Sequence, residues 1–356
     1  MKLSVPFIPE PAYIDFLKTH RQFLASIYFP PASGPVCDAR VRSADSRKPN
    51  VIPLKKALVP LAGIKKYILL NTRFISPACY TDTRLLRSIL DEIKDLHQAV
   101  GIQGIVISDF YLVNALAGTG HDIIPLLEAV PGVNSMMDSP DKVSAYLDVL
   151  ERTRFRPPGR LLADRSLNRS PEMLGRMARS VKKQVPGIRM ELLANEGCIF
   201  QCPFKPAHDA HIALSNTGLV NEATCALNRS VGCHDYFFSR PWRLFKSPFI
   251  RPEDQSHYRE TADALKICGR TLGPRFLERC ITAYINNTFD GNLIDIMDAP
   301  AFLADRFHIS NKALGPDFFN TLTTCTKACK QCSICDKLFK KTAYEKSVSF
   351  KFYKDT

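Results

Sequence analysis

Apolar residues along the chain predict strands and helices that alternate. Short apolar runs predict buried strands, whereas apolar residues spaced three and four apart predict amphipathic helices. The expected strands lie at 23–29, 67–71, 104–108, 123–130, 161–163, 188–194, 244–247 and 264–268. The expected helices lie at 83–100, 110–117, 139–151, 170–185, 252–262 and 272–286. Residues 37–56 are polar and basic and predict a loop or a short helix.

The helix at 83–100 has the clearest pattern. Its apolar positions include Leu86, Leu90 and Ile93, which fall on one helical face. Asp82 precedes this helix as the expected N-cap, and Gly101 follows it as the expected stop.

This alternation predicts an α/β fold with a parallel sheet and right-handed crossovers. Eight strands are the number needed to close a barrel. We therefore expect a TIM-like (β/α)8 barrel at 61–290, an N-terminal extension at 1–60 packed on the barrel, and an irregular, Cys-rich C-terminal tail at 291–356. An open doubly wound sheet is the alternative. The chain has neither a GxGxxG motif after the first strand nor a P-loop motif, so no nucleotide-binding loop is predicted.

Composition agrees with a globular protein, and charge is concentrated in two segments. Of the 356 residues, 45% are hydrophobic and 23% are charged, which is typical of a soluble globular chain. The net charge is +13, and segments 152–189 and 326–356 carry the excess of Lys and Arg. These segments predict either an RNA-binding surface or a solvated helix face followed by a basic tail.

No membrane span and no secretory signal are expected. Polar residues interrupt the most apolar stretch, 99–117, and two prolines lie within the first nine residues. The sequence therefore predicts a cytoplasmic protein. In a reducing compartment the 12 cysteines are not expected to form disulfides, so their spacing becomes informative.

Four cysteines near the C-terminus predict a metal centre. Cys325, Cys329, Cys332 and Cys335 are separated by three, two and two residues. Thiolates suit zinc or iron–sulfur clusters, and a Cys-x2-Cys-x2-Cys run favours a [4Fe–4S] cluster. Zinc in the tail remains open.

A second set of cysteines follows the expected strand at 188–194. Cys198 and Cys202 lie in a polar loop, and Cys233 comes later in a long insertion. Residues that follow a barrel strand lie at its C-terminal face, where active sites are built. Cys79 and Cys268 are candidates for a further ligand at this face, or packed core thiols. Three lone cysteines fit buried packing: Cys37, Cys225 and Cys280.

Several polar residues near the same face are candidates for catalysis. Arg251 and Arg270 could hold a carboxylate or phosphate, or could form ion pairs with neighbouring acids. Glu196 fits a general acid/base or a loop-capping carboxylate. His208, with His211, fits a proton donor near the cysteines or a polar residue of the insertion.

The residues around these cysteines carry a family resemblance. The string ELLANEGCIFQCPFKPAHDAHIA at 191–213, GC at 232–233, KSPFIRPED at 246–254 and LKICGRT at 265–271 resemble the peptidase U32 family. The resemblance implies a TIM-like barrel. The family name implies proteolysis, but several relatives are iron–sulfur proteins that hydroxylate without oxygen, among them ubiquinone-ring hydroxylases and tRNA and rRNA base hydroxylases with prephenate as the implied oxygen donor. Cys268 stands where many members have an acidic residue.

The resemblance implies one [4Fe–4S] cluster on Cys198, Cys202, Cys233 and a fourth thiol, and the tail predicts a second. The expected function is an iron–sulfur hydroxylase or related oxidoreductase. A U32-type peptidase and a cluster-bearing or RNA-binding subunit without turnover are the alternatives. Expected partners are an anionic small molecule or RNA as substrate, and a protein of the same family.

Overall fold

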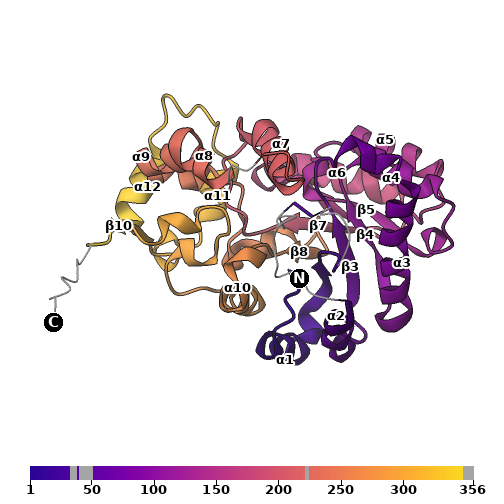
Figure 1. Cartoon of the computed structure of the whole chain (residues 1–356). Helices are drawn as coiled ribbons and strands as arrows, with labels where there is room; N and C mark the ends of the chain where they lie inside the picture. The colour runs from indigo at the N-terminus through magenta and orange to yellow at the C-terminus, as the bar shows by residue number, and fades with distance from the viewer. Residues whose placement is uncertain (33–37, 40–50, 221–223, 348–356) are drawn as a thin grey trace, which may run out of the picture.

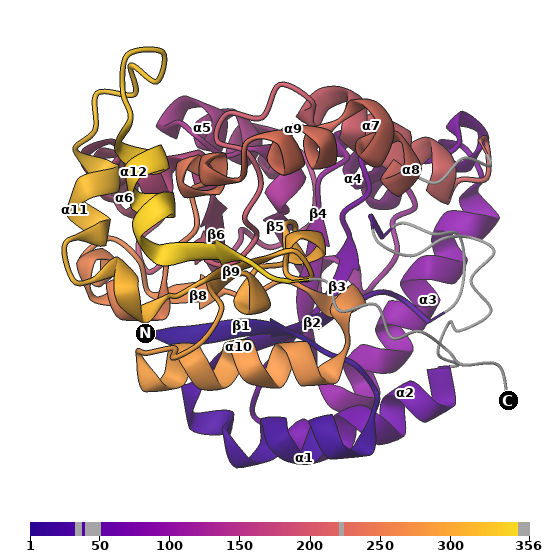
Figure 2. The same cartoon turned by 90° about the vertical axis from the view of Figure 1, so that its left-hand side faces the viewer.

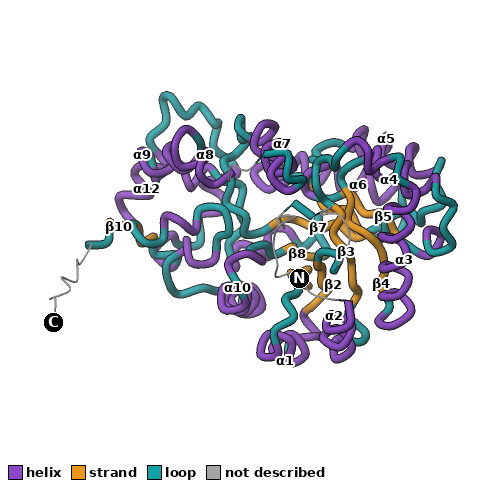
Figure 3. Tube along the Cα trace, viewed as in Figure 1, coloured by secondary structure: helices purple, strands orange, loops and turns teal. Residues whose placement is uncertain are grey.

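Eight parallel strands form a nearly closed barrel surrounded by helices (Figures 1 and 3). The computed structural model describes residues 1–32, 38–39, 51–220 and 224–347. Around the barrel the order is β5-β4-β3-β2-β1-β8-β7-β6. The strands are β1 (Lys2–Pro6), β2 (Leu24–Phe29), β3 (Lys65–Leu70), β4 (Ile102–Ile107), β5 (Glu128–Pro131), β6 (Arg160–Ala163), β7 (Arg189–Leu193) and β8 (Ala264–Lys266).

The barrel closes between β5 and the segment just before β6. Glu128 forms an isolated parallel bridge with Arg156. The Arg156 amide donates to the carbonyl of Leu127 at 2.9 Å, and the Ala129 amide donates to the carbonyl of Arg156 at 3.3 Å. The expected TIM-like (β/α)8 fold is therefore confirmed.

The first strand and the seventh expected strand differ from the prediction. β1 and β2 both belong to the barrel, so the expected extension outside it at 1–60 is wrong. Residues 244–247 are not a strand, because Pro241–Lys246 forms a 3-10 helix. Its apolar side chain Phe245 packs on the rings of Phe318 and Phe339 in the C-terminal segment, outside the sheet. The count of eight was right because these two errors offset each other.

Helices cover the outside of the barrel. They are α1 (Pro11–Thr19), α2 (Val51–Leu58), α3 (Thr83–Val100), α4 (Phe110–Gly118), α5 (Pro140–Glu151), α6 (Pro171–Gln184) and α10 (Pro274–Asn286). The predicted ends of α3 are confirmed: the Asp82 side chain accepts from the Leu85 amide at 3.0 Å, and Gly101 has φ of 73°. The expected helix at 252–262 is a 3-10 helix over Pro252–Tyr258. Figure 2 shows α10 alongside β1.

Two further groups of elements lie beyond the barrel. The long insertion after β7 folds as α7 (Lys205–Asn216), α8 (Thr224–Val231) and α9 (Cys233–Ser239). The C-terminal segment, expected to be irregular, contains β9 (Phe307–Ile309), α11 (Phe318–Thr323), α12 (Ile334–Thr342) and β10 (Ala343–Glu345). β9 and β10 pair antiparallel. No helix in the described part of the chain has the length and apolar character that a membrane crossing requires.

The inside of the barrel is layered. An apolar layer holds Tyr28, Tyr67, Leu69, Val106 and Val130, apart from the larger core between sheet and helices. The layer toward the N-terminal ends of the strands is polar and is centred on the buried Arg160.

Arg160 is held by charge and by hydroxyl groups. Its Nη1 donates to Glu191 at 3.1 Å and to Ser26 at 2.6 Å, and its guanidinium lies 3.6 Å from the Tyr67 ring centroid. Ser4 also donates to Glu191 at 2.6 Å, whereas Arg160 Nε is buried and has no hydrogen-bond partner among the described residues.

Candidate functional site

A small cavity opens over the C-terminal ends of β2, β3, β4, β7 and β8. Its volume is about 80 Å³. One part of its wall is apolar, formed by Tyr28, Leu69, Val106 and Leu193, and another part is polar, formed by residues that include Glu196, Lys266, Arg270 and Asp298. The cavity lies at the face of the barrel where this fold places active sites.

Lys266 projects into this cavity from β8, although no pattern in the sequence marked it as a site residue. It is 7% exposed, and its Nζ lies 4.0 Å from the Tyr28 ring centroid. No acceptor within the described ranges takes a hydrogen bond from Nζ. Burial lowers the pKa of Lys266 to about 8, Arg160 adds to this, and Glu191 opposes it.

Arg270 lines the same cavity, at the barrel mouth where its position after the last strand predicts it. Its Nη2 pairs with Asp38 Oδ1 at 2.5 Å, whereas its Nη1 is buried and has no hydrogen-bond partner among the described residues. Gly269 allows this turn, because its φ is +110° and a Cβ there would lie 2.1 Å from the Phe276 ring.

Glu196 forms an ion pair with Arg165, and both side chains are largely buried. Although burial acts against the charge of Arg165, its pKa is raised, because Glu196 and Cys198 face it. The carboxylate is thus held in place by Arg165 at the edge of the cavity.

Cys198, Cys202 and Cys233 lie in the loop after β7 and at the start of α9. The carbonyl of Cys198 accepts from Ser247 Oγ at 2.6 Å, which fixes the loop. Burial raises the pKa of Cys202, while Arg165 opposes this. Burial also raises the pKa of Cys233, and the nearby Cys202 adds to it.

The other barrel cysteines have different surroundings. Cys268 lines the cavity, and its thiol donates to Asn195 Oδ1 at 3.2 Å. Cys79 lies in a 3-10 helix (Pro77–Tyr80) and packs against the apolar core. Cys280 is fully buried, which confirms the expected packing role. Cys37 and the side chain of Cys225 fall outside the described residues.

All four tail cysteines line a single cavity of about 190 Å³. Arg169 Nη2 donates to the Cys325 sulfur at 3.4 Å. Phe200, which lies between Cys198 and Cys202 in the sequence, lines the same cavity and stacks under Arg169 at 5.7 Å. The tail cavity and the barrel loop are therefore neighbours.

Within residues 1–32, 38–39, 51–220 and 224–347, no group of three or more Cys, His, Asp or Glu side chains is arranged to hold a metal ion.

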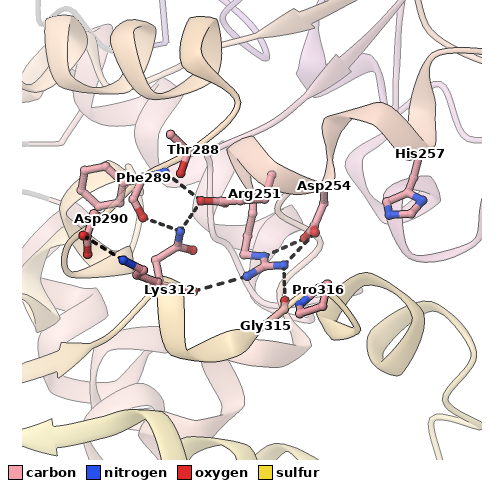
Figure 4. A pocket seen from close by; sticks show the side chains of 11 residues that line it. Arg251, Asp254, His257, Thr288, Phe289, Asp290, Lys312, Gly315 and Pro316 are labelled. Atoms are coloured by element: carbon pink, nitrogen blue, oxygen red, sulfur yellow. Dashed lines mark hydrogen bonds and ion pairs between the residues drawn. The ribbon is translucent and has the colours of Figure 1, made fainter.

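Arg251 lies elsewhere than expected (Figure 4). Its guanidinium pairs with both oxygens of Asp254 at 2.7 Å and donates to the carbonyl of Gly315 at 3.0 Å. It lines a separate cavity of about 450 Å³ and not the one at the barrel mouth. The ion-pair alternative therefore describes Arg251, and the expectation that it faces the barrel mouth is wrong.

The remaining candidate side chains are engaged in local contacts. His208 lies on α7 with its Nε2 3.3 Å from Asn228 Nδ2. His211 lies on the same helix and is half-buried. Of the eleven cations at 152–189, three are buried inside the fold, namely Arg160, Arg165 and Arg169, so the basic surface is smaller than the sequence implies.

Gly197 lies in the loop after β7, in a backbone conformation and a packing environment that only glycine fits. Its φ is +75°, and a Cβ there would lie 2.6 Å from Pro300 Cδ and 2.8 Å from Met297 Cε. We expect Gly197→Ala to destabilise the protein by about 2–3 kcal/mol, measured by urea unfolding.

Gly101→Ala is the matched control for Gly197→Ala. Gly101 has φ of +73°, but among the described residues no atom lies within 4 Å of the position that a Cβ would take. This change keeps the backbone strain and adds no steric clash, so we expect it to cost about 1 kcal/mol. Equal losses for the two variants would contradict the steric argument.

Comparisons with known proteins give one sequence relative. No family model matches the chain. An uncharacterised protease of Methanocaldococcus jannaschii is 28% identical over 250 residues, which are 68% of this chain and 67% of that protein.

Two solved structures resemble the fold. The U32 peptidase Mk0906 has 18% identity, with 75% of this chain and 92% of that chain covered and a TM-score of 0.46. N-(5'-phosphoribosyl)anthranilate isomerase from Pyrococcus furiosus has 10% identity, 61% and 84% coverage and a TM-score of 0.30.

The barrel has the architecture that the motifs implied. The relative named as a protease covers two thirds of the chain. The chain is thus similar to a protein named as a protease, and through its NEGC-x3-CPF motif it resembles the peptidase U32 family.

Proposed function

We propose that this protein is an iron–sulfur enzyme of the U32 type that carries out an oxygen-independent hydroxylation or a related redox reaction. The observation that carries the proposal is the single cavity lined by the four tail cysteines. Four thiols are the donor types of a [4Fe–4S] cluster, although in the structure they line the cavity without converging on one metal position, and zinc is the alternative occupant.

The charges around the tail cavity support an anionic occupant. Burial raises the pKa of Cys335, and the other three tail thiols add to this, while Arg169 opposes it. A cluster bound by four thiolates is negatively charged. Arg169 and Lys327, which both line the cavity, would offset that charge.

The barrel loop offers a second donor set. We assign Cys198, Cys202 and Cys233 to it, because Cys202 lies near Cys233 and Arg165 faces both Cys198 and Cys202. A cluster there would supply one-electron transfer beside the barrel mouth. Cys268 and Cys79 are left out of this set, since one binds Asn195 and the other packs against the core.

The chain's own residues would bind and enclose the substrate. Lys266 and Arg270 are the cations of the cavity lining, and Asp38, Glu196 and Asp298 are its acids. Since Glu196 is paired with Arg165 and Asp38 binds only one side of Arg270, the two cations can still contact an anionic group of the substrate. The apolar wall formed by Tyr28, Leu69 and Val106 excludes water from the bound molecule.

A peptidase is the second candidate, because the Methanocaldococcus relative is named a protease. A cysteine peptidase needs a thiolate nucleophile at neutral pH. Burial raises the pKa of both Cys202 and Cys233, which acts against a free thiolate at either position in the absence of a metal. The hydroxylase proposal is preferred on the four cysteines that line the tail cavity, for which a peptidase has no use.

Metal analysis of the anaerobically purified protein tests the proposal. We expect about eight iron and eight acid-labile sulfide per chain. Cys198→Ser with Cys202→Ser should remove half, and Cys329→Ser with Cys332→Ser should remove the other half. Cys280→Ser is the matched control, because that buried thiol contacts Asn195 and the Ile296 carbonyl and is outside both sets.

The other outcomes separate the alternatives. Zinc alone, or no metal, would exclude the redox proposal. Peptide cleavage that persists in the Cys198 and Cys202 double variant would favour the peptidase.

A further inference from the structure

Two lysines are buried within the described part of the chain, and only one of them has hydrogen-bond acceptors for its Nζ. Lys66 is 2% exposed, and its Nζ donates to the carbonyls of Leu61 and Ile64, both at 3.0 Å. Lys266 is buried to a similar degree, yet within the described part of the chain no acceptor bonds its Nζ. Burying an amine without acceptors costs free energy, so its retention needs a reason other than stability.

The direction in which the Lys266 side chain points suggests a functional reason for keeping this buried amine. Ser4 and Leu193 flank it in the barrel register, and its side chain points inward to the floor of the cavity at the mouth. The Tyr28 ring covers one side of Nζ. The amine thus faces a largely apolar space, open at the barrel mouth, that can admit a ligand of a few heavy atoms.

A second unsatisfied group lines the same cavity. Arg270 Nη1 is buried, and no described residue accepts a hydrogen bond from it. The Asp38 carboxylate holds Nη2 and so fixes the plane of the guanidinium. A guanidinium oriented in this way is suited to a carboxylate.

We propose that Lys266 is a nucleophilic residue whose Nζ forms an imine with a small aldehyde or ketone, and that Arg270 holds a carboxylate of the same ligand. A desolvated lysine beside other cations has the surroundings that make an amine nucleophilic. This proposal does not depend on the iron–sulfur proposal, since it uses none of the assigned cysteine ligands.

The covalent step balances without an oxidant or reductant. The amine nitrogen adds to the carbonyl carbon, and the carbonyl oxygen takes up a proton to give a carbinolamine. The nitrogen then loses its remaining proton, the hydroxyl group takes up a proton and leaves as water, and a C=N bond forms. The net change is one amine plus one carbonyl to one imine plus one water.

Reductive trapping on the full-length protein tests this proposal. The protein is incubated with pyruvate and sodium cyanoborohydride near neutral pH, digested, and mapped by mass spectrometry. We expect the adduct on Lys266 to form at least about tenfold faster than on exposed lysines, because the ion pair with Arg270 concentrates the ligand. Acetone, which lacks a carboxylate, should show about a tenth of this labelling or less.

Three variants make the outcome of the test unambiguous. Lys266→Arg should lose the adduct, while Lys312→Arg, which changes an exposed lysine, should label as the unaltered protein does. Arg270→Gln should abolish the preference for pyruvate over acetone but leave Lys266 in place. The comparison of pyruvate with acetone in this variant therefore tests the proposal even if Lys266→Arg fails to fold.

Labelling of Lys266 at the rate of exposed lysines, or an unchanged preference for pyruvate in Arg270→Gln, would overturn the proposal. Iron and sulfide content of Lys266→Arg is measured in parallel and should stay unchanged. The labelling of Lys266 therefore tests the imine proposal, and the iron and sulfide content tests the iron–sulfur proposal independently.

Discussion

Lys266→Met is expected to stabilise the protein at pH 7, by about 3 kcal/mol. Burial lowers the pKa of Lys266 from 10.5 to about 8, so below pH 8 the folded state must keep a buried ammonium. A shift of that size corresponds to about 3 kcal/mol. Methionine has a similar length and removes the charge.

The effect of Lys266→Met on the free energy of unfolding should depend on pH. Between pH 8 and 10.5 the unfolded chain holds a proton on this lysine that the folded chain has released, so stability rises with pH in that range. The advantage of Lys266→Met should therefore be complete below pH 8 and disappear as the pH approaches 10.5. Guanidinium unfolding at pH 7 and pH 9.5 measures it.

Lys66→Met is the matched control for this prediction. Burial lowers the pKa of Lys66 as well, but its amine is bonded to two carbonyls that would lose their partner. We expect no stabilisation from this change. If Lys266→Met destabilises the protein at pH 7, the cost that we assign to the buried amine is wrong.

Arg160→Met is expected to have the largest destabilising effect, about 3–5 kcal/mol. Both side chains of the Arg160–Glu191 pair are nearly fully buried, so removal of the guanidinium leaves an unpaired carboxylate inside the barrel. The same change also removes the donor to Ser26 and the contact with the Tyr67 ring.

An exposed pair is the control for Arg160. Arg176 and Glu172 form an ion pair on α6 with both side chains largely in solvent. Arg176→Met should change the free energy of unfolding by less than about 1 kcal/mol. Combining Glu191→Gln with Arg160→Met should restore part of the loss, because it removes the unpaired charge. A loss for Arg160→Met as small as that for Arg176→Met would refute the argument.

Much of the barrel could be predicted from the hydrophobic pattern. Strands such as 67–71 and helices such as 83–100 follow from periods of apolar residues, and the structure places β3 and α3 there. β1 was missed because Ser4 interrupts its apolar residues and Pro6 and Pro9 argue against a strand. Its burial depends on pairing with β2 and β8, which are distant in the sequence.

Some residues of the candidate site could be predicted from the sequence, and others could not. The tail cysteines could be selected from spacing alone, because they lie within eleven residues. Lys266 could not, since both Leu265 and Lys266 are buried and the strand shows no alternation that marks the inward face. Arg165 gave no signal either, because its importance comes from meeting Glu196 and Cys198 in space.

The closure of the barrel has a consequence for how the protein folds. The hydroxyl of Tyr28 donates to the carbonyl of Ile267, a contact between residues 239 positions apart. Contacts of such sequence separation form slowly, because a long loop must be closed before any interaction rewards it. The space around Lys266 therefore exists only after β1 and β2 have joined β8. A chain that is still folding carries an ordinary, solvated lysine at this position, and the change in its reactivity with time would report when the barrel closes.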